Sequence, residues 1–279
     1  MSINFTMFAQ NSNVDYVQQA SVAAMSIKLT NPKSKIALIT NDNIPKKYKQ
    51  LFDHVVDIPW KDEAEDSQWK IENRWKIYHA TPFDETAVID TDMLVLSDIS
   101  HWHDLMKNKD LYFVNKVLTY RGDIADNMYY RKAFRNHHLP NIYVGCHWFK
   151  KSDTAHEFFK LVELIMHNWE LFYGQYAGGK YFQKWPSMDV SCAIATKILG
   201  CEHEVTLATS YPTFTHMKLH NQNWDKLYVN NWQQQLGVYL NNKCQLTIGN
   251  YTQTGIFHYT EDNFCNEKII KTYETQLGI

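Results

Sequence analysis

Two aspartates separated by one residue follow an apolar run of the sequence. Residues 87–89 are Ala-Val-Ile, then come Asp90-Thr91-Asp92, and residues 93–95 are again apolar. Two carboxylates beside a buried segment are costly unless a positive charge compensates them. Mg2+ and Mn2+ prefer oxygen ligands and also bind the oxygens of a diphosphate. The pattern therefore predicts a divalent metal site at Asp90-Thr91-Asp92, where the ion would neutralise a departing nucleoside diphosphate.

A capped turn with two solvated aspartates is the alternative, because Asp-x-Asp alone is a common pattern. The elements before the turn favour the metal site. Apolar runs and helical spacing predict strands at 3–9, 35–40, 54–58 and 86–89, and helices at 14–29, after Pro45 and at 67–79. Strands that alternate with helices indicate a mostly parallel sheet. Ligands bind beyond the carboxyl ends of such strands, so residues 9–13 and the aspartate turn should share one crevice.

The second half of the sequence is less regular. Its pattern predicts strands at 141–149 and 255–259, helices at 152–171, 187–199 and about 263–277, and a loop at 174–184. We find no internal repeat, low-complexity tract or linker. The sequence therefore predicts one α/β domain over residues 1–279, with a nucleotide-binding half at about 1–100 and an acceptor-side half at about 101–279.

The composition is that of a globular chain. Hydrophobic residues make up 44% of the sequence, and the net charge of -2 gives no general attraction to nucleic acid or to an anionic membrane. The five cysteines are odd in number and show no close metal-ligand spacing, which favours a reduced, cytoplasmic protein over a disulfide framework or a zinc ribbon. No stretch approaches the roughly 18 to 20 apolar residues of a membrane span, and the N-terminus lacks a signal-peptide pattern.

The residues around the aspartate turn resemble a known family. Trp75-Lys76-Ile77-Tyr78 and the run AVIDTDMLVLSDI at 87–99 are similar to the core of GT-A glycosyltransferases, especially family 8-like enzymes. Those enzymes carry a YLDADxLVxxDI pattern after a helix with a donor-contacting lysine. The resemblance covers about the first 100 residues well and the remainder in patches. It implies a Rossmann-like GT-A fold, a UDP-sugar donor, Mn2+ or Mg2+, and retention of the anomeric configuration.

The resemblance also implies donor contacts in the first half of the chain. The end of the first strand and the start of the next helix correspond to the place where the family holds the nucleoside, and a helix N-terminus is free to contact a ligand there. Core packing is the alternative for the two aromatic residues. Lys76 matches the family's donor lysine, with Arg74 as the alternative. The implied nucleoside contacts are Phe8, Ala9, Asn11, Asn13 and Tyr16.

Two patches in the second half match the family more weakly. Residues 141–149 are similar to its FNxGVxxx strand, so Gly145 is expected to let the backbone approach the sugar. Residues 185–190 resemble its DQDVLN block, in which only Asp189 survives as an acid. Asp189 would contact the sugar or the acceptor, or act as the catalytic carboxylate. A charge that complements the first turn of a helix is the alternative.

A histidine is expected to complete the metal site. Residues 255–259 resemble the family's C-terminal HxxGxxKPW motif, without its glycine and its Lys-Pro-Trp, and place His258 at the end of a strand. A neutral imidazole is a suitable third ligand for Mn2+. The segment 215–218 offers a rival arrangement, in which His216 binds the metal and Lys218 binds the phosphate.

The acceptor is suggested by a stretch of basic and aromatic residues at 116–138. Basic side chains contact phosphates and aromatic rings stack on bases, so one hypothesis is a phage-type enzyme that glycosylates a modified base in DNA. A solvated helical face is the alternative, and saccharide, lipid-linked sugar and protein acceptors stay open. The basic residues proposed to contact the acceptor are Arg121, Arg131, Lys132 and Arg135.

Two other function classes compete with sugar transfer. A nucleotidyltransferase that acts on sugar phosphates also uses paired carboxylates and metal, but it usually has a glycine-rich basic loop after its first strand, and none occurs near Asn11. A non-catalytic carbohydrate- or nucleic-acid-binding module would need no metal turn. Loss of nucleotide-sugar hydrolysis on replacing Asp90 or Asp92 separates an enzyme from such a module.

Overall fold

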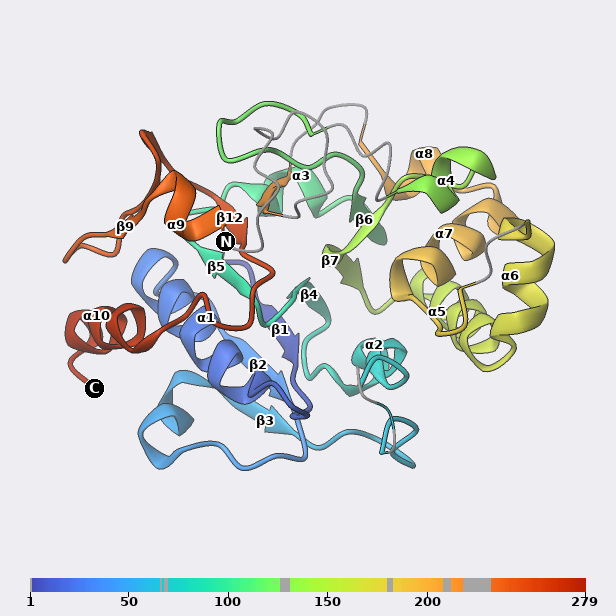
Figure 1. The fold of residues 1–279 in the computed structure, drawn as a ribbon. Helices are drawn as coiled ribbons and strands as arrows, with labels where there is room; N and C mark the ends of the chain where they lie inside the picture. The colour runs from blue at the N-terminus through green and yellow to red at the C-terminus, as the bar shows by residue number, and fades with distance from the viewer. Residues whose placement is uncertain are drawn as a thin grey trace.

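A six-stranded sheet forms the centre of the molecule (Figure 1). The computed structural model describes residues 2–65, 67, 70–125, 131–179, 183–207, 212–217 and 232–279. Within the sheet, β1 is parallel to β2 and β4, and β2 is parallel to β3, whereas β7 is antiparallel to both β4 and β6. The predicted mostly parallel α/β sheet is therefore confirmed. Its strands, in spatial order, are β3 His54–Val56, β2 Ile36–Ile39, β1 Phe5–Phe8, β4 Glu85–Ile89, β7 Tyr143–Lys150 and β6 Leu111–Val114.

Helices cover the sheet from two sides and bury two hydrophobic cores. Helix α1 (Tyr16–Thr30) lies against α10 (Glu267–Leu277), and α5 (Asp153–His167) lies against α7 (Met188–Leu199), on opposite sides of the drawing in Figure 1. Asp15 caps α1, because its side chain accepts from the backbone N–H of Gln18. Helix α1 is buried nearly all round, and its buried polar residues are Gln19, Ser21 and Ser26.

Two predicted helices differ in the structure. Instead of a helix at 67–79, the described residues form only a 3-10 turn, η2 (Arg74–Lys76), and a short helix α2 (Ile77–Ala80). The fully buried Asn73 side chain donates to Gln10 and Asp62, and these contacts hold the preceding residues as a loop. The predicted helix 152–171 is divided at Asn168, whose side-chain amide donates to the Leu164 carbonyl, and the following helix α6 (Trp169–Ala177) occupies the start of the predicted loop.

A smaller sheet extends the main one where β4 ends. It contains β5 (Met93–Val95), β12 (Ile256–His258) and β8 (Phe214–His216) in the order β5-β12-β8. The register pairs His258 with Met93 on one side and with His216 on the other. The C-terminal part of the chain is thereby brought beside the aspartate turn.

The remaining elements are short, and they complete the described part of the chain. A third sheet has the order β11-β10-β9. None of the described helices is long and apolar enough to span a membrane. The other elements are η1 Lys46–Leu51, α3 Trp102–Met106, α4 Lys132–Asn136, α8 Glu202–Val205, α9 Trp232–Leu236, β9 Val238–Leu240, β10 Leu246–Ile248 and β11 Tyr251–Thr252.

Candidate metal and donor site

A cleft of about 760 Å3 opens at the carboxyl ends of β1 and β4. The end of β1 contributes Phe8 and the residue Gln10 to its wall, and the turn after β4 contributes Asp90, Thr91 and Asp92. The two strand ends thus share one crevice, as expected for neighbouring parallel strands. The start of β7, the start of α7 and the smaller sheet close the other sides of the cleft.

Asp90, Asp92 and His258 converge in this cleft. Each offers one ligand atom, and these three atoms all lie within 4.8 Å of one another. The Nε2 atom of His258 lies 2.9 Å from Oδ2 of Asp92. Two carboxylate oxygens and one imidazole nitrogen are a donor set that suits a divalent ion such as Mn2+ or Mg2+. The residues present therefore fit a metal ion.

Positive groups balance the two carboxylates. The guanidinium of Arg74 lines the cleft and forms an ion pair with Asp90. Burial alone would raise the pKa of Asp92, but the contacts with His258, a backbone hydrogen bond and the charge of Arg74 together outweigh burial, and the pKa of Asp92 is lowered. Asp92 is consequently ionised at neutral pH, which a metal ligand requires.

Gly145 makes room for the Asp90 carboxylate. The Gly145 carbonyl accepts a hydrogen bond of 2.9 Å from the backbone N–H of Asp90. A Cβ atom at position 145 would lie 2.8 Å from Oδ2 of Asp90 and 3.1 Å from Cε of Met93. The sequence predicted a close approach of the backbone to the sugar at this glycine. That approach stays a prediction, and what the structure shows is that the missing side chain leaves space for the Asp90 carboxylate.

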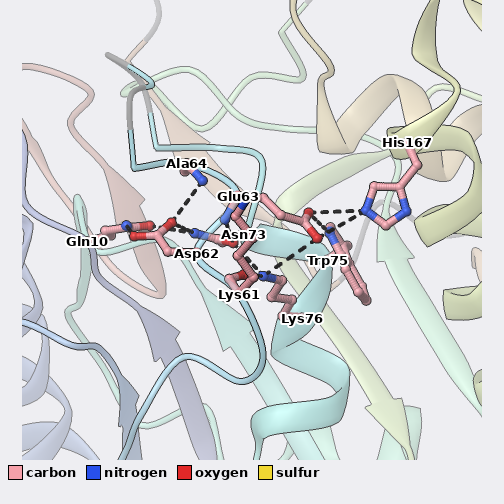
Figure 2. Close-up of polar contacts among 9 residues, drawn as sticks. All are labelled: Gln10, Lys61, Asp62, Glu63, Ala64, Asn73, Trp75, Lys76 and His167. Atoms are coloured by element: carbon pink, nitrogen blue, oxygen red, sulfur yellow. Dashed lines mark hydrogen bonds and ion pairs between the residues drawn. The ribbon is translucent and has the colours of Figure 1, made fainter.

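Lys76 does not reach the cleft, so the prediction that it contacts the donor is wrong. Its side chain is fully buried and donates to the Lys61 carbonyl and to Oδ1 of Asn73, 2.7 Å away (Figure 2). In a 3-10 turn the side chains of successive residues point about 120° apart, so residues two apart face different directions. Arg74, the alternative, is the residue of this turn that lines the cleft.

The structure places only some of the predicted nucleoside contacts in the wall of the cleft. Phe8 and Tyr16 line the cleft, whereas Ala9, Asn11 and Asn13 are not part of its wall. The Asn11 side chain accepts from the Val17 backbone N–H, so it stabilises the loop before α1. Burial raises the pKa of Tyr16, and the charges of Asp262 and Asp92 raise it further, so Tyr16 stays a neutral phenol.

Asp189 lies in the cleft with both carboxylate oxygens already bonded. Oδ1 accepts from the Val144 backbone N–H at 2.8 Å, and Oδ2 accepts from Nη1 of Arg131 at 2.5 Å. Arg131 is only 2% exposed, and it also donates to the Asn141 side chain and the Ile142 carbonyl. The prediction that Arg131 contacts an acceptor from the surface is therefore wrong, because its guanidinium is used inside the protein.

The other proposed acceptor residues lie outside the cleft wall. Arg121 is within 4.0 Å of Asp123, and Lys132 and Arg135 are exposed on the short helix α4. Lys218 lies outside the described residues, and so do Asp126, Tyr129 and Tyr130 of the basic and aromatic stretch.

His258, rather than His216, belongs to the convergent group. His216 is buried and lines the cleft, and its ring stacks on that of His258 with 4.6 Å between centroids and an angle of 6° between planes.

The loop residues Lys70, Ile71, Trp185 and Thr260 also line the cleft and were missed by sequence reasoning. Of these four residues, only Trp185 lies in a segment that resembles a family motif, residues 185–190, and there the resemblance rested on Asp189.

No protein-family model and no curated protein matches the sequence, whereas solved structures do match. The galactosyltransferase LgtC, in complex with donor and acceptor sugar analogs, is 13% identical with a TM-score of 0.54, over 98% of this chain and 96% of that one. An active-site mutant of LgtC is 14% identical with a TM-score of 0.52, over 99% and 95%. Mouse xyloside xylosyltransferase 1, in its apo form, is 10% identical with a TM-score of 0.50, over 92% and 97%. At such identities the likeness shows a shared fold, which is that of GT-A glycosyltransferases.

Proposed function

We propose that this chain, which has the fold of GT-A glycosyltransferases, is a metal-dependent enzyme that transfers a sugar from a nucleotide-sugar donor to an acceptor hydroxyl. The observation that carries the proposal is the convergence of Asp90, Asp92 and His258 in the cleft at the carboxyl ends of the strands. The matched structures of a galactosyltransferase and a xylosyltransferase support sugar transfer as the reaction class. The donor we propose is a UDP-sugar.

The proposed metal site consists of the two aspartates and the histidine. The imidazole in this set favours Mn2+ over Mg2+, because Mg2+ is held mainly by carboxylates and water. When bound, the ion supplies positive charge for the diphosphate leaving group. Arg74, beside Asp90, supplies a second positive charge that can bind diphosphate oxygens.

The remaining cleft residues have proposed roles that follow from their chemistry. Phe8 and Tyr16 offer ring faces for the nucleoside, as the family resemblance implies. Asp189 is fixed by Arg131 and by the Val144 N–H, so it is well placed to accept hydrogen bonds from sugar hydroxyls. Because Arg131 and the Val144 N–H hold both Asp189 oxygens, we propose that Asp189 positions the sugar in a retaining reaction rather than acting as the base of an inverting one.

We propose a saccharide rather than a modified DNA base as the acceptor. Arg131 is buried, and none of Arg121, Lys132 and Arg135 lines the cleft, so these four described residues provide no path for a nucleic acid backbone into it. The exposed Trp185 stands in the cleft wall, where it offers an aromatic face for a sugar ring.

A thermal-shift screen of nucleotide sugars with and without Mn2+ tests the proposal. We expect a UDP-sugar to raise the Tm only when Mn2+ is present, and we expect Asp90→Asn and Asp92→Asn to abolish both this shift and UDP-sugar hydrolysis. Asp104→Asn, at an exposed aspartate of α3, is the matched control and should behave as the wild type. Metal-independent binding, or full hydrolysis by both site variants, would contradict the proposal.

The same assay separates the competing reactions. Sugar transfer or hydrolysis releases a nucleoside diphosphate, whereas a nucleotidyltransferase releases pyrophosphate from a nucleoside triphosphate and a sugar phosphate. A non-catalytic module releases neither product. No contact of the described residues favours either of these two classes over sugar transfer.

A further inference from the structure

Trp60 is an exposed aromatic residue with a strained backbone. Its side chain is 65% exposed, and its φ angle is +61°, in the left-handed region that bulky residues rarely adopt. Such a conformation is strained and is often found at ligand-binding positions. Glycine or asparagine would fit this backbone with less strain, and the exposed indole contributes little burial. Burial of its own surface therefore gives little reason for a tryptophan here.

The Trp60 indole is held in one orientation by other rings. It stacks on Trp75, with 5.6 Å between centroids and 17° between planes. The His79 ring lies edge-on to both indoles, with centroids 5.2 Å from Trp60 and 5.8 Å from Trp75. Trp75 itself is only 2% exposed. One face of Trp60 is thus covered by Trp75, while the rest of the Trp60 ring is open. A ring of a ligand could stack on the open part, and little side-chain entropy of Trp60 would be lost.

Acidic side chains lie beside Trp75, the indole on which Trp60 stacks. Nε1 of Trp75 donates to Glu63, 3.2 Å away, and the Glu63 carboxylate also lies 3.2 Å from Nε2 of His167 (Figure 2). Glu63 lines a hollow of about 370 Å3, whose wall also includes Lys61, the neighbour of Trp60 in the sequence. The wall of this hollow contains four carboxylates and one lysine. Its residues are Lys61, Asp62, Glu63, Glu65, Ser67 and Glu72.

One polar network connects this surface to the cleft. Asp62 accepts from the Gln10 side chain at 2.6 Å and from Asn73 at 2.5 Å, and Gln10 lines the cleft (Figure 2). On the following 3-10 turn, Arg74 faces the cleft whereas Trp75 supports Trp60. Within the described residues of 60–76, Arg74 therefore faces the catalytic cleft, and Trp60 and Trp75 form the aromatic surface.

We infer that Trp60 and the adjoining acidic hollow form a second saccharide-binding site, which holds a distal sugar of an extended acceptor glycan. The inference rests on the proposed glycosyltransferase function. A pyranose presents a face of C–H groups that packs on an aromatic ring, and hydroxyls that donate to carboxylates. The net negative charge disfavours nucleic acids and other polyanions. A cage for a quaternary ammonium group needs several open rings, and here Trp75 is closed.

The test is retention of the full chain on an array of neutral and amino-sugar oligosaccharides, with heparin, single-stranded DNA and a lysine-rich peptide as additional probes. We expect the wild type to bind a subset of the oligosaccharides. Trp60→Ala should weaken that binding at least about tenfold, which corresponds to the loss of one stacking contact. Tyr239→Ala is the matched control, because Tyr239 is exposed to a similar extent on β9 and should leave retention unchanged.

A second variant separates binding from folding. Trp60→Gly removes the ring and relieves the positive φ angle, so it should keep the wild-type Tm, lose glycan retention, and leave Mn2+-dependent UDP-sugar hydrolysis unchanged. Absence of any glycan binding by the wild type would overturn the inference. So would wild-type retention by both Trp60 variants, binding of the polyanions or the peptide in place of glycans, or a collapse of the Tm in both variants.

Failure of this inference and failure of the proposed function give different results. If Trp60 variants bind glycans as the wild type does while Asp90→Asn abolishes hydrolysis, the second site is wrong and the enzyme proposal stands. If Trp60→Ala loses glycan binding but no nucleotide sugar binds with metal, the saccharide site stands and the proposed reaction is wrong.

Discussion

Gly145→Ala is the most direct test of how the metal ligands are positioned. The added Cβ would lie 2.8 Å from Oδ2 of Asp90, whereas ordinary van der Waals contact begins at 3.4 Å. The second contact, with Cε of Met93, involves the end of a flexible side chain that can move aside. The Asp90 side chain is held by its ion pair with Arg74, so the carboxylate itself has to be displaced.

The expected displacement is large for a metal site. Restoring ordinary contact requires a movement of about 0.6 Å, the difference between 3.4 and 2.8 Å. Metal–ligand distances tolerate deviations of about 0.2 Å, and changes in the residues that support metal ligands typically cost 10- to 100-fold in metal affinity. We therefore expect Gly145→Ala to weaken Mn2+ binding by about 10- to 100-fold. Its φ angle is not positive, so the Tm should change little.

Calorimetric titration of the purified protein with Mn2+ alone measures this effect. Gly174→Ala on α6 is the matched control, because a Cβ there would meet nothing within 4 Å, and its affinity should equal that of the wild type. Equal Mn2+ affinity of Gly145→Ala and the wild type would refute the argument, since Asp90 would then not be the ligand that Gly145 accommodates.

Three further predictions concern stability. Lys76→Met should lower the free energy of unfolding in urea by about 1–3 kcal/mol, because the buried acceptors of Lys76 lose their hydrogen-bond donor. It should leave Mn2+-dependent binding of the nucleotide sugar unchanged. Loss of nucleotide-sugar binding would instead show that Lys76 belongs to the site. Arg131→Met should cost about 3 kcal/mol, and Asp189→Asn in the same chain should recover part of it, whereas additive losses would deny their coupling. Burial raises the pKa of Glu261 from 4.5 to about 7, so the folded protein keeps a proton that the unfolded chain releases, and stability falls as the pH rises from about 4.5 to 7. Glu261→Gln should therefore raise the free energy of unfolding at pH 8 by about 1–2 kcal/mol after allowance for solvent screening, but not at pH 4, and equal effects at both pH values would contradict this assignment.

Local sequence patterns were sufficient to predict the parallel strands and the position of the aspartate turn. An apolar run that stops at Asp90 identifies both a buried strand and its end, and these features depend on near neighbours in the chain. His258 could be proposed as a ligand because it ends such a run and resembles a family motif, and the structure places it with the aspartates.

The errors involve residues whose environment is set by distant parts of the chain. Lys76 was expected in the site, but its position depends on a 3-10 turn that the loop contacts of Asn73 produce. Arg131 looked like a surface residue because its partner Asp189 is 58 residues away. Trp60 gave no periodic signal, since its φ angle and its stacking on Trp75 arise only in the folded chain.

The position of His258 links metal binding to the integrity of the C-terminal region. It is 166 residues from Asp92 in sequence, and it reaches Asp92 because β12 pairs with β5. An ion chelated by both residues would close a very long loop and so act as a removable cross-link between the turn after β4 and the C-terminal strand β12. Since only the native pairing supplies all three ligands, Mn2+ should slow amide hydrogen exchange in β12, and a chelator should reverse this protection.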